Sequence, residues 1–256
     1  CVIPSIRGRF RSISMERILE EAKVLAAKGI KELILVAQET TLYGVDLYGE
    51  KTLPKLLREL CRIEGPEWIR LMYCYPEELT DELIAVIRDE KKIVKYLDMP
   101  VQHASDSVLK RMGRRTNQKE LREQIQKLRR EIPQIVLRTS LITGFPGETE
   151  SDFAELCDFV REIKFDRLGV FTYSKEEGTP AAKLKPQILQ RIKRQRRDQI
   201  MRIQQDIAFE RAKQRIGTVL EVQIEGAIPE EEIYVARGYM DAPNVDGYVF
   251  VKAERG

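Results

Sequence analysis

The stretch QIVLRTSLITGFPGETESDF (residues 134–153) passes from a strand pattern to a helix pattern across one turn. Residues 134–142 are rich in branched apolar side chains, which favour a buried strand. A Gly-Phe-Pro-Gly turn follows, and Thr149 with Asp152 three residues later is typical of a helix start. The stretch therefore predicts a strand joined by a short turn to a helix.

The same strand-then-helix unit recurs along the first two thirds of the chain. Four more strand-like runs occupy 31–37, 68–74, 94–99 and 166–173, and helix-like segments occupy 14–28, 53–63, 80–88, 117–132 and 150–163. Units repeating every 30 to 40 residues or so predict an α/β fold with a parallel sheet, as a barrel or a doubly wound sheet. We interpret the strands as buried on both faces. Because a helix precedes the first strand, a further strand is expected upstream.

A different composition follows the fifth strand. Residues 174–186 look like a connector, and a basic helix is expected from there to about Gln214. Residues 185–216 contain ten Lys or Arg and three Asp or Glu, whereas residues 217–256 contain three and eight. Short β-patterned pieces in the latter segment predict a small antiparallel β module, cut short after three strands. The expected domains are a barrel core lacking its first strand (1–184), a linking helix (185–216) and the module (217–256).

Composition excludes several classes of protein. The chain has 256 residues, 43% of them hydrophobic and 33% charged, with a net charge of +3, which allows a sizeable core. The longest apolar run, residues 33–37, is too short to span a bilayer and no signal-peptide pattern is present, so we expect a cytoplasmic protein with no membrane partner. The four cysteines lack paired spacing, which disfavours a disulfide framework and a self-contained zinc site.

Polar and glycine residues follow the predicted strands at their carboxyl ends. They include Gln38, Glu39, Gln102, His103, Gly144 and Tyr173. In parallel α/β folds these ends meet at one edge, where ligands bind. The sequence therefore predicts a cofactor site at that edge. His103 is the only histidine, so a metal site built on three histidines is excluded.

Each of these features has a structural alternative. Gln38 and Glu39 either cap their long loop or hold a polar ligand, and His103 is either a hydrogen-bonding core residue or part of the site. The GFPGET turn either offers free N–H groups to an anion or only joins a strand to a helix. The basic helix either contacts a nucleic acid backbone or is a solvated helix packed on the barrel.

Six motifs occur here together, in the order CVIPSIRGRFRS, QETTLYGVDLYG, YCYPEELTDELI, YLDMPVQHASDSVLKRMGR, LRTSLITGFPGETESDF and YMDAPNVDG. Over nearly its whole length the sequence resembles the radical S-adenosylmethionine (SAM) methylthiotransferases. QETTLYG, PVQHAS and YMDAPNVDG resemble the branch that modifies an aspartate of a ribosomal protein (the RimO type). The tRNA-modifying MiaB type is the alternative. The acidic module also suits a basic protein partner better than RNA.

The resemblance implies an open, partial TIM-like barrel of six βα units, followed by a TRAM-like module. It implies a 4Fe-4S cluster bound by a C-x3-C-x2-C loop, whose third cysteine matches Cys1, and SAM chelated to the free iron. A second cluster would lie in a separate N-terminal domain, and a second SAM would supply the methyl group. The product would carry a methylthio group on the β-carbon of an aspartate in the twelfth small-subunit ribosomal protein. The ribosome is a further candidate partner, and the reductant protein is not identified by the sequence.

The resemblance also assigns roles to residues at the strand ends. Gln38 and Glu39 would face the amino acid end of SAM; Gln102, His103 and Arg138 would be polar groups around it, and Ile142, Gly144, Phe171 and Tyr173 would border adenine. The sequence lacks the first two cluster cysteines, the first strand, the N-terminal cluster domain and the end of the TRAM module. We therefore expect the isolated chain to bind no stable iron and to be inactive. The competing hypotheses are a non-catalytic ribosome-binding module and a barrel enzyme that binds phosphate through GFPGET.

Overall fold

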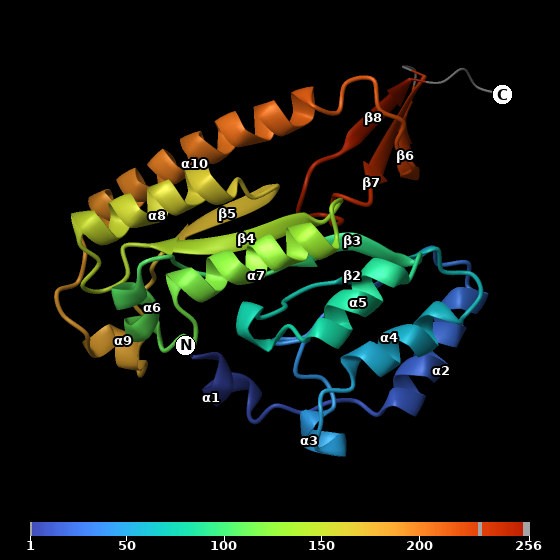
Figure 1. The fold of residues 1–256 in the computed structure, drawn as a ribbon, viewed down its shortest axis with the longest axis horizontal. Coiled ribbons are helices and arrows are strands. Elements are labelled where there is room, and N and C mark those ends of the chain that lie inside the picture. Colours follow the sequence, from blue (N-terminus) through green and yellow to red (C-terminus); the bar gives the residue numbers. More distant parts are fainter. Residues whose placement is uncertain (1, 230–231, 253–256) are drawn as a thin grey trace.

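Five parallel strands form one open sheet in the computed structural model, which describes residues 2–229 and 232–252. The strands, in spatial as well as sequence order, are β1 (Glu32–Leu35), β2 (Trp68–Leu71), β3 (Ile93–Asp98), β4 (Val136–Thr143) and β5 (Arg167–Thr172). Within the described residues β1 and β5 do not pair with each other, so the barrel is not closed (Figure 1). The predicted α/β fold with a partial barrel is confirmed.

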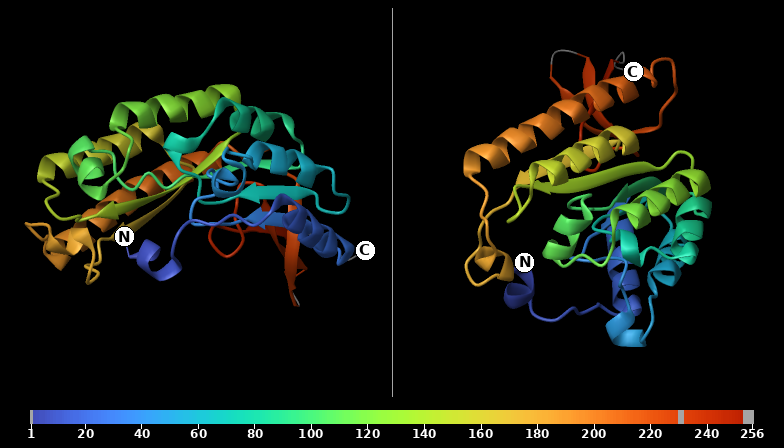
Figure 2. Two further views of the ribbon diagram at one scale, coloured as in Figure 1. Left: turned by 90° about the horizontal axis from the view of Figure 1, so that it is seen from below. Right: turned by 60° about the vertical axis from the view of Figure 1, so that its left-hand side comes forward.

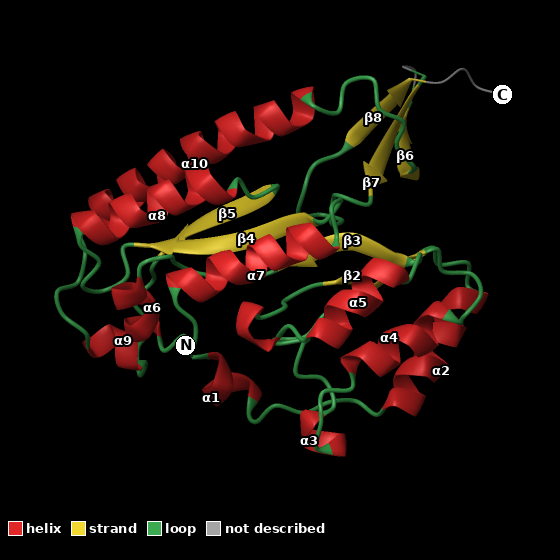
Figure 3. Ribbon diagram, in the orientation of Figure 1, coloured by secondary structure: helices red, strands yellow, loops and turns green. Residues whose placement is uncertain are grey.

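Helices cover the outer face of this sheet (Figure 3). The longer ones are α2 (Met15–Ala27), α4 (Leu53–Cys61), α5 (Asp81–Asp89), α7 (Gln118–Glu131), α8 (Glu150–Ile163) and α10 (Gln190–Lys213). Shorter ones occur in loops, namely α1 (Ile3–Arg7), α3 (Val45–Tyr48), η1 (Pro76–Glu78), α6 (Asp106–Met112) and α9 (Pro180–Lys183). Capping boxes at Asn117 and Thr149 begin α7 and α8, because each side chain accepts a hydrogen bond from an otherwise unpaired N–H.

The apolar core lies between the sheet and these helices. Alternate strand residues such as Leu33, Ile69, Leu137 and Leu141 are buried there. A fully buried aliphatic side chain contributes about 1.5–3 kcal/mol, so this layer is the main source of stability. None of the helices in the described part of the chain is long and apolar enough to cross a membrane.

The inner face of the sheet is charged, and it is buried mainly on β2, β3 and β4. The predicted burial of both faces is wrong for the two edge strands, where Ile34 is 37% and Phe171 60% exposed, because no further strand of the described chain covers them. The other set of alternate residues includes Glu32, Arg70, Asp98, Arg138 and Arg167, one from each strand. Arg70 Nε donates to Glu32 Oε1 at 2.7 Å, and Arg138 Nη1 donates to Asp98 Oδ1 at 2.6 Å. Pairing makes the burial of these charges tolerable.

A three-stranded antiparallel sheet follows α10, as predicted. It consists of β6 (Val222–Ile228), β7 (Ile233–Gly238) and β8 (Val249–Lys252). It lies at the amino-terminal end of the parallel strands (Figures 1 and 2). Residues 239–246, here called the floor loop, enter the barrel, where Met240 and Ala242 pack with Tyr96 and Val136. The floor loop covers the end of the barrel opposite to the carboxyl edge.

Candidate functional site

A cavity of about 490 Å³ opens at the carboxyl edge of the parallel sheet. Ligand sites typically measure about 300–1,000 Å³. The residues that shape it include Val2, Tyr75, Glu77, Gln102, Arg114, Arg115, Ile142, Phe145, Phe171 and Tyr173. The structure therefore brings together four of the predicted contact residues, from the loop after β3 and from the ends of β4 and β5.

Two charged residues of the cavity were not predicted from the sequence. Arg114 lies with its guanidinium carbon 4.5 Å from the centroid of the Tyr75 ring and donates from Nη2 to Pro100 O at 2.6 Å. Its buried Nε has no partner among the described residues, and neither does the buried Oε2 of Glu77. An unpaired cation and an unpaired carboxylate in one cavity suit a zwitterionic amino acid group.

An apolar wall faces these charges. Ile142, Phe145 and Phe171 supply it, and Phe145 packs edge-on against Tyr173 with the ring centroids 5.2 Å apart. Burial raises the pKa of Tyr173, whose hydroxyl is a further buried group without a partner in the described chain. Such a wall with one polar atom suits a flat heteroaromatic ring.

Gln102 is held at the cavity by its backbone. Its N–H donates to Ser140 O at 3.0 Å and its carbonyl accepts from Ile142 N at 2.8 Å, which fastens the loop after β3 to β4. This arrangement requires a left-handed backbone conformation at Gln102, where φ is 71°. A non-glycine residue in this region is uncommon and is often found at functional sites.

His103 does not line the cavity. It is fully buried, its Nδ1 accepts from Ser105 N at 2.9 Å, and its Nε2 lies 3.6 Å from Glu148 Oε2. Gly144 does not line the cavity either. Its φ is +72°, and a Cβ there would lie 2.2 Å from Lys193 Cγ, so both the backbone and the space favour glycine.

The GFPGET turn does not offer an anion site. Glu148 Oε2 already accepts from Gly144 N at 2.7 Å and from Phe145 N at 3.3 Å, and Oε1 accepts from Arg196 Nη1 at 2.6 Å. The turn therefore holds its own carboxylate where a phosphate would bind. This overturns the hypothesis of a phosphate-binding barrel enzyme and favours the structural interpretation of the turn.

Gln38, Glu39 and Arg138 lie outside the cavity. Gln38 is exposed, whereas Glu39 is buried and accepts from Thr41 N at 2.9 Å, so its carboxylate ties its own loop. Burial raises the pKa of Glu39 despite these hydrogen bonds. Arg138 lies on the inner face of β4, four residues before Ile142 and therefore farther from the carboxyl edge. Their contact with a cofactor remains a prediction.

Cys1 lies outside the described residues, and its neighbour Val2 lines the cavity. Among the residues that the structure describes, no cluster of three His, Cys, Asp or Glu is arranged to hold a metal ion. Cys61, Cys74 and Cys157 are free thiols, and burial raises the pKa of Cys61 and of Cys157 to about 11. Burial also raises the pKa of Cys74, so these three cysteines carry little thiolate at neutral pH.

Asp152 joins the two loops that shape the cavity. Ser105 Oγ donates to its Oδ1 at 2.5 Å, Ser107 Oγ also donates to Oδ1, and Thr149 N donates to Oδ2 at 2.8 Å. Burial alone would raise the pKa of Asp152, but these hydrogen bonds outweigh it and hold the pKa well below the ordinary value. The ionised form is thus favoured in the folded protein.

Asp152→Asn is expected to lower the free energy of unfolding by about 1.5–3 kcal/mol at pH 7, the range for hydrogen bonds to charged groups. A carboxyl whose pKa is depressed by folding stabilises above its unfolded pKa and loses that contribution as pH falls through its folded pKa. The gap between wild type and variant should therefore shrink below about pH 4. Urea unfolding between pH 7 and pH 3 measures it; a gap that stays constant with pH would contradict the assignment.

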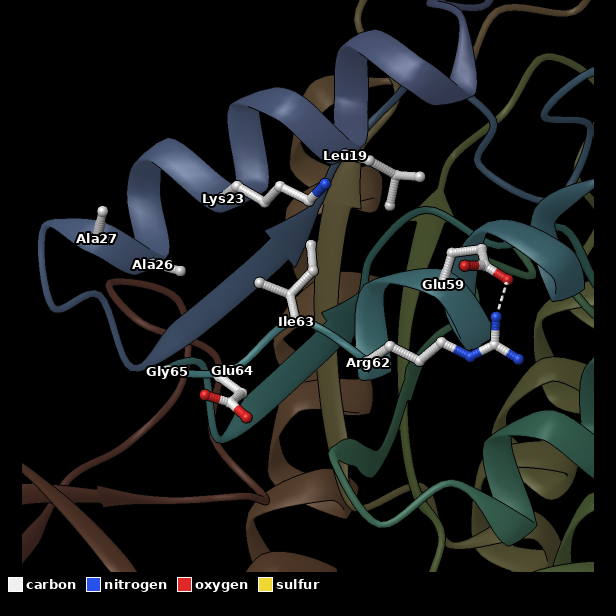
Figure 4. A pocket seen from close by; sticks show the side chains of 9 residues that line it. All are labelled: Leu19, Lys23, Ala26, Ala27, Glu59, Arg62, Ile63, Glu64 and Gly65. Carbon is white, nitrogen blue, oxygen red and sulfur yellow. Dashed lines mark hydrogen bonds and ion pairs between the residues drawn. The ribbon is translucent and has the colours of Figure 1, made fainter.

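A second hollow lies far from this edge. It measures about 660 Å³ and runs between α2 and α4, with Leu19, Lys23, Ala26, Arg62 and Gly65 among its lining residues (Figure 4). Gly65 precedes β2 and Ala26 lies near the end of the helix before β1, so the hollow is at the amino-terminal edge. No unpaired buried polar atom of the described residues belongs to its lining, and we assign it no chemistry.

The open sheet of βα units, with a ligand cavity at its carboxyl edge, defines the chain as a partial βα-barrel protein of the kind that binds small cofactors. The family model "Radical SAM superfamily" matches residues 1–160, and the chain belongs to that superfamily. The model "TRAM domain" matches residues 216–256. Membership in the superfamily implies SAM and a 4Fe-4S cluster.

Two similar curated proteins carry the same name. The chain is 64% identical over 98% of its length to "Ribosomal protein uS12 methylthiotransferase RimO" of Lachnoclostridium phytofermentans, of which it covers 57%. It is 52% identical over its whole length to the protein of the same name from Caldanaerobacter subterraneus, of which it covers 58%. The chain thus spans a little more than half of these relatives.

Solved structures share the fold. Coproporphyrinogen III oxidase HemN from Escherichia coli matches 85% of this chain, which covers 48% of it, with a TM-score of 0.56 at 23% identity. Methylornithine synthase PylB matches 77% of this chain, which covers 55% of it, with a TM-score of 0.53 at 16% identity. At these identities the likeness shows the fold alone.

Proposed function

We propose that this chain is the catalytic core of a radical SAM methylthiotransferase that modifies the β-carbon of an aspartate in ribosomal protein uS12. The observation that carries the proposal is the cavity at the carboxyl edge, which is lined by a cation, a carboxylate and apolar side chains. The cation and the carboxylate each have a buried polar atom without a partner among the described residues. SAM has all three complementary parts. The name shared by these relatives supports uS12 over tRNA as the substrate. Because the substrate would then be a ribosomal protein, we also propose a cytoplasmic location.

Different cavity residues would bind different parts of SAM. Arg114 would hold the carboxylate of SAM and Glu77 its ammonium group, because each presents a buried polar atom without a partner in the described chain. Gln102 would donate a hydrogen bond to SAM from the edge of the cavity, and Ile142 and Phe171 would border its adenine ring. When bound, SAM and the iron-sulfur cluster supply the radical chemistry that activates an unreactive carbon. The protein binds and orients the reactants and excludes water.

Cys1 is proposed as one of three thiolate ligands of the radical cluster, with two clusters in the full-length enzyme. The place of Val2 in the cavity wall supports this, since it brings the chain next to Cys1 toward the proposed SAM site. The acidic C-terminal module is proposed to attract the basic substrate protein, or the ribosome that carries it. The donor protein for electrons is not specified by these residues.

The test compares this chain with the same chain carrying its natural upstream sequence, both reconstituted anaerobically with iron and sulfide and supplied with a chemical one-electron reductant. The extended chain is expected to bind a cluster, form 5′-deoxyadenosine from SAM and modify uS12, whereas the chain alone should hold no stable iron. Cys1→Ala in the extended chain should remove the cluster, and Cys61→Ala is the matched control that should not. Modification of tRNA in place of uS12, or a cluster indifferent to Cys1→Ala, would refute the proposal.

A further inference from the structure

A buried lysine of the basic helix α10 lies next to the wall of the cavity at the carboxyl edge. Lys193 belongs to the first turn of α10 and is only 6% exposed, whereas most lysines lie on protein surfaces. Its stem packs on the turn after β4 at Gly144, which has no side chain to obstruct it. Because an ammonium group loses its water on burial, it needs polar partners inside the protein.

The ammonium group of Lys193 contacts Tyr173 twice, and Tyr173 lines the cavity. Lys193 Nζ donates to Tyr173 O at 2.7 Å and lies 4.7 Å from the centroid of the Tyr173 ring. The π electrons of an aromatic ring attract a cation at this distance, and the attraction is stronger where water is excluded. Lys193 therefore restrains both the backbone and the ring of one cavity residue.

Thr143 completes a closed set of hydrogen bonds with these two residues. Tyr173 N donates to Thr143 O at 2.9 Å, and Thr143 Oγ1 donates to Lys193 O at 3.1 Å. The end of β4, the residue after β5 and the first turn of α10 are thus bonded to one another. The Tyr173 ring also packs edge-on against Phe145, another cavity residue. The position of the ring depends on all of these contacts.

We propose that Lys193 is a positioning residue for Tyr173, so that α10 shapes the ligand site from outside the parallel sheet. The proposal rests on the proposed function, since it takes SAM as the ligand of the cavity. The buried hydroxyl of Tyr173 has no partner among the described residues, so the position of this ring affects both the shape of the wall and the hydrogen bond that it can offer. At this turn the basic helix packs on the barrel and does not present Lys193 to a nucleic acid.

The test measures the affinity of this chain for S-adenosylhomocysteine, a SAM analogue, by titration calorimetry. Lys193→Met removes the ammonium group and keeps an unbranched stem. It is expected to weaken binding about fivefold to thirtyfold, the equivalent of losing one cation–π contact shielded from water. Tyr173→Leu should also weaken binding, and the double variant should bind no more weakly than Tyr173→Leu alone, because Lys193 acts through the ring. Arg194→Met removes the neighbouring, exposed cation of α10 and is the matched control, which should bind as the wild type does.

Lys193→Arg distinguishes positioning from simple packing, because arginine keeps the positive charge over the ring. It should restore part of the affinity lost in Lys193→Met. Equal weakening in these two variants, or additive losses in the double variant, would overturn the positioning role. A thermal unfolding midpoint measured for each variant shows whether the fold persists. If Lys193→Met does not fold, Lys193→Gln is the second neutral variant and should show the same loss of affinity.

The proposed SAM site can fail separately from the role of Lys193. Normal affinity in Lys193→Met beside weakened affinity in Arg114→Gln would overturn the positioning role and leave the SAM site standing. Normal affinity in Tyr173→Leu would remove Tyr173 from the ligand contacts, and the role of Lys193 with it. A wild-type chain that binds no S-adenosylhomocysteine would refute the SAM site and therefore this inference as well.

Discussion

Replacing Glu148 with alanine is expected to lower the free energy of unfolding by about 3–5 kcal/mol, the cost of breaking a buried ion pair from one side. The Glu148 side chain is 0% exposed and its partner Arg196 only 6%. The variant would remove the buried carboxylate partner of that guanidinium and leave it only its exposed one. It would also leave the N–H groups of Gly144 and Phe145 without the acceptor to which they now donate. Chemical denaturation with urea measures the loss.

Glu150 provides the matched control. Its Oε1 accepts from Nη2 of the same Arg196 at 2.5 Å, but its side chain is 83% exposed. Glu150→Ala should therefore cost less than about 1 kcal/mol, as is usual for surface ion pairs. Equal losses in the two variants would show that burial of Glu148 does not control its contribution. A loss in Glu148→Ala confined to the turn, without global destabilisation, would contradict the prediction as well.

Local signals explain why much of the fold could be predicted. The helix expected over 150–163 is α8, and the strand expected at 134–142 overlaps β4 at Val136–Thr143. Both depend on neighbours within a few residues, such as Thr149 and Asp152 in a capping box. The short helices in loops were not predicted, because a helix of one or two turns has too few residues to show a period.

Long-range pairing explains what could not be predicted. Arg70 donates to the backbone of Tyr239 across 169 residues, and Arg237 pairs with Glu32 across 205 residues. The strand pattern led us to expect buried residues on both faces of each strand, and it does not reveal which charged side chains pair across the inner face. Nothing near Arg70 or Glu32 in the sequence indicates that a loop of the C-terminal module will meet them. The charged inner face therefore emerged only from the structure.

Some residues of the candidate site could be predicted from the sequence, and others could be located only in the structure. Gln102 and Tyr173 follow strands, so topology predicted them at one edge, whereas Ile142 and Phe171 were assigned through the family resemblance. Arg114 could not be located in this way, because it follows the glycine that ends α6, well after β3. The sequence signal for Arg114 is the basic run RMGRR (residues 111–115), which follows Gln102 at the end of a short helix.

Arg114→Gln is expected to weaken S-adenosylhomocysteine binding by about tenfold to a hundredfold, which corresponds to losing one charge-assisted hydrogen bond of about 1.5–3 kcal/mol. The buried Nε of Arg114 has no partner in the described part of the chain, and the guanidinium lies over the Tyr75 ring, so Arg114 is the cation best placed to meet a ligand carboxylate. Titration calorimetry gives the dissociation constant. A thermal unfolding midpoint measured alongside shows whether the fold survives the substitution.

A variant of Arg115 shows whether ligand binding depends on the total positive charge of the cavity or on the position of Arg114. It borders the same cavity, but its side chain is 74% exposed and it already pairs with Glu78 Oε1 at 3.3 Å. If the cavity attracted the ligand only through its total positive charge, Arg115→Gln would weaken binding as much as Arg114→Gln. Because an exposed cation is screened by water and the buried Nε of Arg114 is not, we expect Arg115→Gln to change the dissociation constant less than about threefold. Equal effects would remove Arg114 from the proposed SAM contacts and leave a general electrostatic attraction in its place.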